Sequence, residues 1–407
     1  MLKRMLFVLA KQYKSEANLW LKALGRKENV AVCFIPKSDC IIRLDQLVKD
    51  KEIIQILPSS YRYTFQIINF KQPQIENSES LYIQLANHLN ASHILNKSLS
   101  FTEWMEYFKS QNTILILVIP EAEELLSPIN RHILTLLSNL FDEYYPYIRI
   151  LSAFESHITH SRTLNYLPSS TRLYANVFTY PLYGTADTNL FIDVLEKMFE
   201  VKVSEKQRIE IINLCGGHWW FVKEAVRQIS AQGKWVIDSE GIQFRLRMFL
   251  ASFSDFETSL FKKLIYDKSD FSPEEKESIS FYQNMHFIDS KNQMSIPIFT
   301  NFLKKEMEQS IKIKFEDNKM FINQVPVDSF FSKKERRILS LLLKHSNILV
   351  TRDQIAESIW PEDTQEHYSD WAIDQLITRL RKRLAKLSIS SSRLKLVRGK
   401  GYIFRNI

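Results

Sequence analysis

The first 180 residues alternate between short, continuous apolar runs and amphipathic segments, a pattern typical of an α/β domain. Four apolar runs are expected to be strands, at residues 29–36, 63–68, 113–119 and 148–153. Four segments with helical spacing are expected to be helices, at residues 41–57, 81–89, 101–108 and 133–140. Because the strands lack polar alternation, they predict a parallel sheet covered on both faces. With the helical and winged-helix regions that follow, the predicted fold class is multidomain α/β plus α+β.

The middle of the chain is expected to be helical. From residue 188 to 230 the spacing is helical, and Gly216-Gly217 ends one helix before the next begins. Further helices follow in 241–308, one of them starting at Ser272-Pro273, and residues 287–296 predict a hairpin. Helices followed by a hairpin indicate a small winged helix. This winged helix could contact DNA. A role as a spacer or a dimer contact is favoured, because its face is not strongly basic.

The last hundred residues predict a second winged helix. Residues 311–327 alternate apolar and polar positions, as short antiparallel strands do. One helix is expected to begin near Ser332, with Glu335 at capping-box spacing, and a second helix spans 351–360. A third helix is expected from Asp370 to Leu387. Its apolar stripe is Ile373, Leu376, Ile377, Leu380 and Leu384. A tight hairpin with basic residues at its tip follows at 396–404. The predicted domains are thus 1–180, 181–240, 241–308 and 309–407.

Charge is concentrated in the last of these domains. The chain has 54 Lys and Arg residues, of which 19 lie in 311–407. It has 46 Asp and Glu residues, of which 11 lie in the same range. The first 310 residues therefore hold 35 of each, and the whole net charge of +8 belongs to the C-terminal domain. Such asymmetry indicates a domain that meets a polyanion. The alternative is an ordinary solvated charged surface, but here the charge coincides with a helix and a hairpin of suitable form.

Composition places the chain among globular proteins and excludes some classes. A length of 407 residues suits two to four domains, and no apolar stretch is long enough for a membrane span. Three cysteines without C-x-x-C spacing favour a reducing compartment over a disulfide framework. The apolar run near the N-terminus is broken at Lys11, too early for a signal peptide, so a buried strand or helix is expected there. We therefore expect a cytoplasmic protein.

The C-terminal segments resemble the OmpR/PhoB-type winged-helix effector domain over nearly all of 309–407. The resemblance lies in residues 351–355, Ile373-Asp374 with 380–384, and 397–402. It implies double-stranded DNA as a partner and the third helix as the recognition helix. It also implies a base-facing Arg379, a minor-groove Arg398 in the wing, and backbone contacts from Arg381, Lys382 and Tyr402.

The residue types fit these roles. Arg379 and Lys382 lie off the apolar stripe, and arginine can bind guanine in bidentate fashion. Gln375 and Thr378 share this polar face and are candidates to read adenine or a thymine methyl group. Lys400 at the wing tip is a further expected DNA contact. Other expectations are structural: a salt bridge for Arg381 or Arg383 and a structural or spacer role for Asp374. For Trp360 and Trp371, core packing is favoured over contact with a base.

The N-terminal arrangement resembles, over about residues 20–240, an AAA+/STAND-like ATPase core with a helical lid. This resemblance implies a phosphate-binding loop after the first strand and acids after a later strand. The chain departs from both. The loop at 36–40 has no glycine, no Walker or G-x-G-x-x-G motif occurs, and Pro120 precedes Glu121 where a Mg²⁺-holding aspartate is implied. His218 stands where the family has a variable residue or proline. The sequence predicts a scaffold without ordinary nucleotide chemistry.

Alternative functions have weaker support. Residues 6–13 lack the acidic pair of a phospho-receiver domain, His157 and His160 have no third metal ligand nearby, and no nucleophile-elbow pattern occurs. We expect no catalytic residues, no metal and no cofactor. The prediction is a sequence-specific DNA-binding transcriptional regulator, with homo-oligomerisation and contact with RNA polymerase as further possibilities. The alternatives are an ATP-binding switch that docks on DNA, and a scaffold whose winged helices bind protein.

Overall fold

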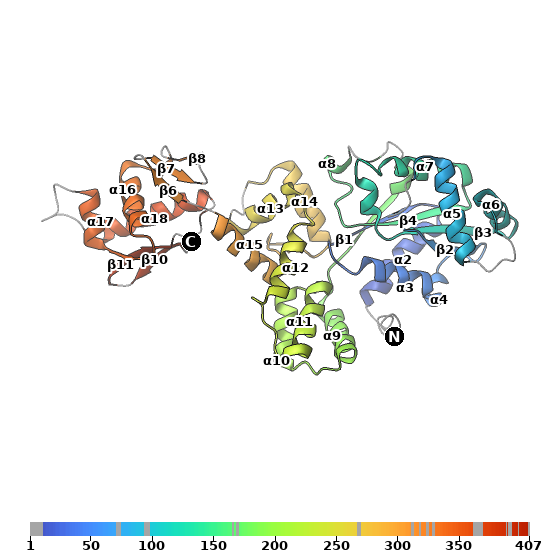
Figure 1. Ribbon diagram of the computed structural model, residues 1–407, viewed down its shortest axis with the longest axis horizontal. Coiled ribbons are helices and arrows are strands. Elements are labelled where there is room, and N and C mark those ends of the chain that lie inside the picture. Colours follow the sequence, from blue (N-terminus) through green and yellow to red (C-terminus); the bar gives the residue numbers. More distant parts are fainter. Residues whose placement is uncertain are drawn as a thin grey trace. The chain divides into compact units, whose positions relative to one another are not determined.

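The computed structural model describes residues 11–70, 75–92, 98–164, 167, 171–266, 270–310, 313–316, 319–322, 325–327, 330–360, 369–387, 389, 393–397 and 399–405. By contacts the chain divides into two units, Met1–Thr258 with Phe271–Ile298 and Ser259–Asp270 with Phe299–Ile407. Figure 1 labels the elements of both units. None of the helices in the described ranges is long and apolar enough to cross a membrane. The expected strand or helix near the N-terminus falls mainly on residues outside the described ranges.

A five-stranded parallel sheet forms the centre of the first unit. Its strands are β1 (Val30–Phe34), β2 (Arg62–Ile67), β3 (Thr113–Ile119), β4 (Ile148–Phe154) and β5 (Asn176–Tyr180), in the order β2-β3-β4-β1-β5. Every residue of β1, β3 and β4 is buried, as expected for strands covered on both faces. The predicted parallel sheet and its four strands are confirmed. The fifth strand, β5, was not predicted.

Helices connect the strands and continue beyond the sheet. The connecting helices are α2 (Lys11–Gly25), α3 (Cys40–Lys49), α4 (Lys51–Ile54), α5 (Ser78–Ser92), α6 (Phe101–Ser110), α7 (His132–Tyr144) and α8 (Ser161–Leu164), with short 3-10 helices η2 (Ala122–Leu126) and η3 (Thr171–Tyr174). The predicted single helix over 41–57 is wrong. Asp50 accepts hydrogen bonds from the amides of Glu52 and Ile53 and so begins a separate helix, α4.

The predicted helical region follows β5. It comprises α9 (Thr185–Phe199), α10 (Glu205–Cys215), α11 (Trp219–Gln232), α12 (Glu240–Leu250), α13 (Asp255–Tyr266), α14 (Pro273–Asn284) and α15 (Pro297–Ser310). Gly216 and Gly217 both have positive φ, and a Cβ on Gly217 would lie 2.0 Å from the Tyr183 carbonyl oxygen. The predicted Gly-Gly break between two helices is therefore required by the backbone. The hairpin predicted at 287–296 is reduced to one β-bridge between Ile288 and Met294.

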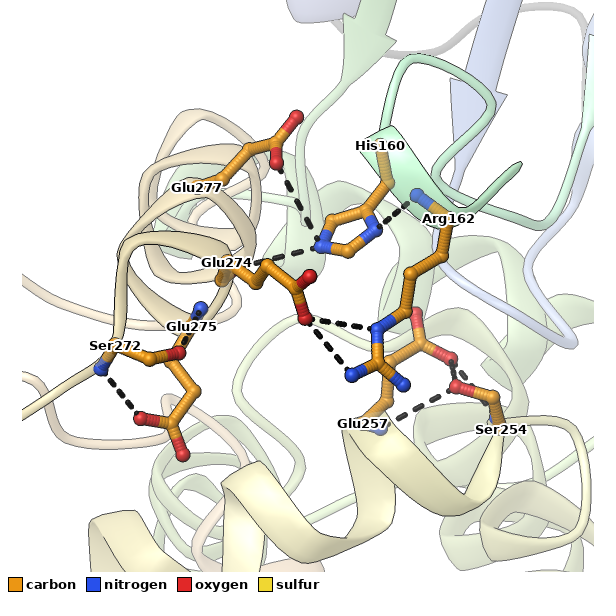
Figure 2. A network of polar contacts seen from close by, with 8 residues as sticks. All are labelled: His160, Arg162, Ser254, Glu257, Ser272, Glu274, Glu275 and Glu277. Atoms are coloured by element: carbon orange, nitrogen blue, oxygen red, sulfur yellow. Dashed lines mark hydrogen bonds and ion pairs between the residues drawn. The ribbon is translucent and has the colours of Figure 1, made fainter. Parts of the chain in front are cut away.

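The segment after β4 fastens the sheet to the helices that follow it, within the first unit (Figure 2). The Arg162 guanidinium binds the Glu274 carboxylate at 2.8–2.9 Å, and His160 Nε2 lies 3.7 Å from the Glu277 carboxylate. His157 stacks on Phe281 with ring centroids 3.7 Å apart. The two histidines considered as metal ligands are thus engaged in packing and polar contacts with α14.

The C-terminal elements belong to the second unit. Strands β6 (Ile313–Glu316), β7 (Lys319–Ile322) and β8 (Val325–Pro326) form an antiparallel sheet, as predicted. They precede α16 (Lys333–Lys344), β9 (Leu349–Thr351), α17 (Arg352–Ile359), α18 (Asp370–Lys386), β10 (Leu394–Val397) and β11 (Gly401–Phe404), and the last strands pair in the order β10-β11-β9. The predicted winged helix, with its third helix and hairpin, is confirmed.

A buried ion pair anchors the loop between β1 and α3. Arg43 Nε lies 2.7 Å from Asp39 Oδ2, both side chains are about fully buried, and the Tyr183 hydroxyl contacts both groups. Removing one member would leave an unpaired charge in the interior. We therefore expect Arg43→Ala to lower the free energy of unfolding by about 3–5 kcal/mol.

Urea denaturation followed by circular dichroism would measure this loss. The matched control is Lys49→Ala, which breaks the more exposed Asp45–Lys49 pair and should cost under about 1 kcal/mol. Equal losses in the two variants would contradict a stabilising role for the buried pair.

Candidate nucleic-acid interface

The exposed face of α18 carries the polar side chains that the sequence assigned to DNA. Gln375, Thr378, Arg379 and Lys382 are all exposed, while the apolar stripe Ile373, Ile377, Leu380 and Leu384 is fully buried. Helical geometry places these four polar residues along one side of α18, since their spacing is i, i+3, i+4 and i+7. The Thr378 hydroxyl donates to the Asp374 carbonyl oxygen at 2.7 Å. We name Gln375, Thr378, Arg379 and Lys382 the reading face.

One carboxylate holds α18 to its neighbours. Asp374 accepts a hydrogen bond from Arg352 Nη2 at 3.1 Å and another from the Tyr402 hydroxyl. Arg352 begins α17 and Tyr402 lies in β11, so this one side chain joins both helices of the helix-turn-helix to the wing. The predicted structural role of Asp374 is confirmed. Arg352 had no predicted role, and its side chain is mostly covered at the start of α17.

Tyr402 lies in the core, where its exposed fraction is 2%. Burial, with the hydrogen bond to Asp374, raises the pKa of the Tyr402 hydroxyl to about 12, so this group stays protonated and donating at neutral pH. The only polar group of the Tyr402 side chain is thus bonded to Asp374, and contact of Tyr402 with the DNA backbone stays a prediction.

Arg381 also points toward the protein. Its Nε and Nη2 atoms donate to the Leu394 carbonyl oxygen at 3.2 and 2.7 Å, which joins α18 to β10. Arg383 pairs with the buried Glu335 carboxylate of α16 at 3.2 Å. A salt bridge was an expectation for both of these arginines, and for Arg381 it was the alternative to a contact with the DNA backbone. It holds for Arg383, whereas Arg381 binds a carbonyl group instead.

The wing places one expected contact at the surface. Lys400 is exposed at the turn between β10 and β11, and Arg398 lies outside the described residues. Gly399 has a φ of +70° and Gly401 a φ of +146°, and a Cβ on Gly401 would lie 2.1 Å from the Val350 carbonyl oxygen. The turn therefore needs glycine at both positions.

The two tryptophans of this region differ in environment. Trp360 is half-buried, and the Lys334 ammonium group lies 5.0 Å from the centroid of its ring. Trp371, in the first turn of α18, is 71% exposed. The predicted core packing of Trp371 is wrong. A helical projection of the sequence could have shown this, because Trp371 precedes Gln375 by four residues and so lies on the polar side of α18.

A second cationic surface covers α16, on the side away from its buried residues. A groove of about 510 Å³ is lined there by Lys333, Arg336, Arg337, Ser340, Leu341, Lys344 and Ser358. Arg337 Nη1 donates to the Ile359 carbonyl oxygen at 3.3 Å, at the end of α17. The basic charge of this region is thus spread over the groove as well as the reading face.

The first unit has a separate pocket at the carboxyl ends of β1, β3 and β4. Its volume is about 630 Å³, and its lining includes Lys37 with the acids Glu121, Glu123, Glu124 and Glu155. The Lys37 amide donates to the Glu155 carboxylate at 2.9 Å, and the Glu155 amide donates to the Glu123 carboxylate at 2.9 Å. Burial raises the pKa of Glu123 and of Glu155 above the usual range. The loop after β1 therefore faces a protein carboxylate where a phosphate-binding loop would face a phosphate.

Comparisons with known proteins identify the C-terminal segment. Residues 329–404 match the family described as "Transcriptional regulatory protein, C terminal", in agreement with the resemblance of this part of the chain to the OmpR/PhoB-type domain. YxdJ of Bacillus subtilis is 34% identical over 97 residues, which cover 24% of this chain and 37% of that protein. The response regulator GraR of Staphylococcus aureus is 36% identical over 74 residues, which cover 18% of this chain and 32% of that protein. The chain spans about a third of the length of these relatives.

Solved structures align with both regions of the chain. The Klebsiella pneumoniae RstA DNA-binding domain in complex with the RstA box is 24% identical, covering 24% of this chain and 93% of that chain, with a TM-score of 0.20. The Walker-type ATPase of Pyrococcus abyssi is 12% identical, covering 71% of this chain and 95% of that chain, with a TM-score of 0.48.

The hydrogen bonds of Asp374 with Arg352 and Tyr402, which position the reading face, can be tested by substitution. Asp374→Ala leaves the buried Tyr402 hydroxyl without its acceptor and removes the nearer of two carboxylates from Arg352, which keeps Asp370 at 3.7 Å. We expect a loss of about 1–3 kcal/mol in the stability of the C-terminal unit, as is usual when a buried polar group loses its partner. Thermal or chemical unfolding followed by circular dichroism would measure it.

Tyr402→Phe is the graded variant, because it removes one hydrogen bond and keeps the ring. It should cost about 1 kcal/mol. The control is Thr378→Val, which removes an exposed hydroxyl and should have a smaller effect. A Tyr402→Phe variant as stable as the parent protein would contradict a stabilising role for the Tyr402–Asp374 hydrogen bond.

Proposed function

We propose that this protein is a sequence-specific DNA-binding transcriptional regulator that acts in the cytoplasm. The observation that carries the proposal is the reading face, an exposed polar strip with two cations on the third helix of an OmpR/PhoB-type domain. Such a helix fits the major groove, where base edges offer distinct donors and acceptors. Arg379 reads a guanine, Gln375 and Thr378 contact neighbouring bases, and Lys382 contacts a phosphate.

The wing supplies the remaining contacts. Lys400, and Arg398 by its place in the sequence, bind the DNA backbone or the minor groove beside the major-groove site. Arg381 and Tyr402 act indirectly, because their polar groups hold α18 to β10 and to Asp374. Phosphate contacts fix the register of a protein on the duplex and base contacts set its sequence preference. Both kinds are therefore available in this domain.

The first unit serves in this proposal as a sensor, an oligomerisation platform or a dock for RNA polymerase, without ATP hydrolysis. The position that should receive a phosphate is taken by Glu155, which accepts the Lys37 amide. The other carboxyl groups around the pocket would repel a triphosphate. This arrangement favours the regulator over the alternative of an ATP-driven switch.

Two substitutions separate base reading from backbone binding. Arg379→Ala should weaken binding to a selected operator duplex by about 1–3 kcal/mol and relax the preference at one base pair. Lys400→Ala should weaken binding to all duplexes by a similar factor and reduce the salt slope by about one. Fluorescence anisotropy on labelled duplexes at several salt concentrations would give both quantities.

The matched control is Lys344→Ala, which removes one positive charge from the groove on α16. It should leave sequence preference unchanged. If Lys344→Ala and Arg379→Ala had the same effect on every duplex, binding would be general electrostatic attraction. Binding insensitive to salt would favour the protein-binding scaffold instead.

The proposed absence of ATP chemistry is tested by calorimetry on the full chain. Titration with Mg-ATP should give no binding tighter than about 1 mM, because the Lys37 amide is already occupied. Micromolar binding would contradict this part of the proposal and support the ATP-driven switch.

A further inference from the structure

Trp371 is exposed to solvent, whereas the other six tryptophans of the chain are buried or half-buried. Trp371 has an exposed fraction of 71%, so most of its indole ring contacts solvent. Aromatic rings bury more apolar area than other side chains, and leaving one in water forgoes that stabilisation. Such exposure on the functional side of a domain indicates a contact made with a partner.

The position of Trp371 places it beside the reading face. It precedes Gln375 by four residues, Thr378 by seven and Arg379 by eight, so all share one side of α18. Trp371 also lies in the first turn of the helix. Recognition helices contact base edges with their N-terminal residues, so this turn is well placed to reach the major groove.

We infer that Trp371 contacts the C5-methyl group of a thymine in the operator. This inference rests on the proposed function and extends it by naming one further specificity-determining residue and its target. Among the base edges of the major groove, the thymine methyl group is the apolar one, and apolar side chains read it by contact. An indole ring matches this group, whereas Gln375 and Arg379 match polar edges.

The surroundings of Trp371 favour DNA over an apolar protein partner. The residues nearest to Trp371 include Asp370, whose exposed carboxylate lies 3.7 Å from Arg352 Nε. Farther along the same side of α18 lie Gln375, Thr378, Arg379 and Lys382, which are polar or cationic and exposed. An apolar partner would have to desolvate these cations, while a duplex would neutralise them. The nearby carboxylate of Asp374 is engaged by Arg352 and Tyr402, so it is partly neutralised.

Helix geometry also predicts where the thymine lies. Eight residues separate Trp371 from Arg379, which corresponds to about 12 Å along an α-helix. Base pairs follow one another every 3.4 Å or so along the duplex. The thymine should therefore lie about three to four base pairs from the guanine that Arg379 reads.

The test removes one methyl group from the DNA and one ring from the protein. An operator is first selected from random duplexes with the full chain. Each thymine is then replaced singly by deoxyuridine, and binding of the parent protein and of Trp371→Ala is measured by anisotropy at fixed salt. One replacement should weaken the parent by about fourfold, the loss expected for one buried methyl group. The same replacement should leave Trp371→Ala unaffected.

A matched control is Ile348→Ala, which removes an exposed apolar side chain between α16 and β9. This variant should keep the full sensitivity to deoxyuridine. Thermal melting of both variants checks that they are folded.

The outcomes separate the inference from the function on which it rests. Sensitivity at one thymine that disappears in Trp371→Ala supports the contact. Sequence-specific binding with no sensitive thymine, or with sensitivity that persists in Trp371→Ala, overturns it and leaves the regulator standing. If Trp371→Ala instead loses a protein partner while DNA affinity is unchanged, the contact is also overturned. The absence of sequence-specific binding by the parent protein refutes the proposed function itself.

Discussion

The geometry of the C-terminal domain depends on the carboxylate of Asp374. It receives the guanidinium of Arg352 from the start of α17 and the hydroxyl of Tyr402 from β11, while its own backbone lies in α18. Three elements that are separate in sequence are thereby fixed around one charge. The side chains of the reading face can then project outward, and of these four residues Thr378 bonds within α18, through its hydroxyl to the Asp374 carbonyl oxygen. Where Arg381 and Arg383 do support it, they lie at the flanks of α18 and bind Leu394 and Glu335.

Carboxylates also hold neighbouring backbone in place in the first unit. Glu155 accepts the Lys37 amide, and Glu123 in turn receives the Glu155 amide and the Ser156 hydroxyl. The chain continues directly to His157, His160 and Arg162, which contact α14. The pocket and α14 are thus joined by one short segment of backbone. A ligand that displaced Glu155 would act on the same segment that holds the sheet to the later helices.

The sequence was most informative where a single physical rule decides the structure. Continuous apolar runs identified β3 and β4, and the stripe from Ile373 to Leu384 identified the buried side of α18. The strand at 176–180 was missed because its residues are only partly buried and its apolar run is short. The break at Asp50 was missed because an N-cap in the middle of an apolar pattern gives little signal. Sequence spacing also shows which way a residue faces, but not which partner a long side chain finds. For this reason the hydrogen bonds of Arg381 to Leu394 and of Tyr402 to Asp374 could not be predicted. Trp371 was expected in the core because tryptophans are usually buried, although its spacing placed it outside.

The close approach of Gly401 to β9 has a thermodynamic consequence. Since no Cβ fits between this residue and the Val350 carbonyl oxygen, β11 lies directly against the strand that leads into α17. The wing strands and the helix-turn-helix are therefore already ordered with respect to each other before any partner arrives. Much of the conformational entropy that a mobile wing would lose on docking has been lost during folding. Association with a duplex should accordingly resemble the meeting of two preformed surfaces, with a heat-capacity change that reflects the interface alone and little contribution from coupled folding.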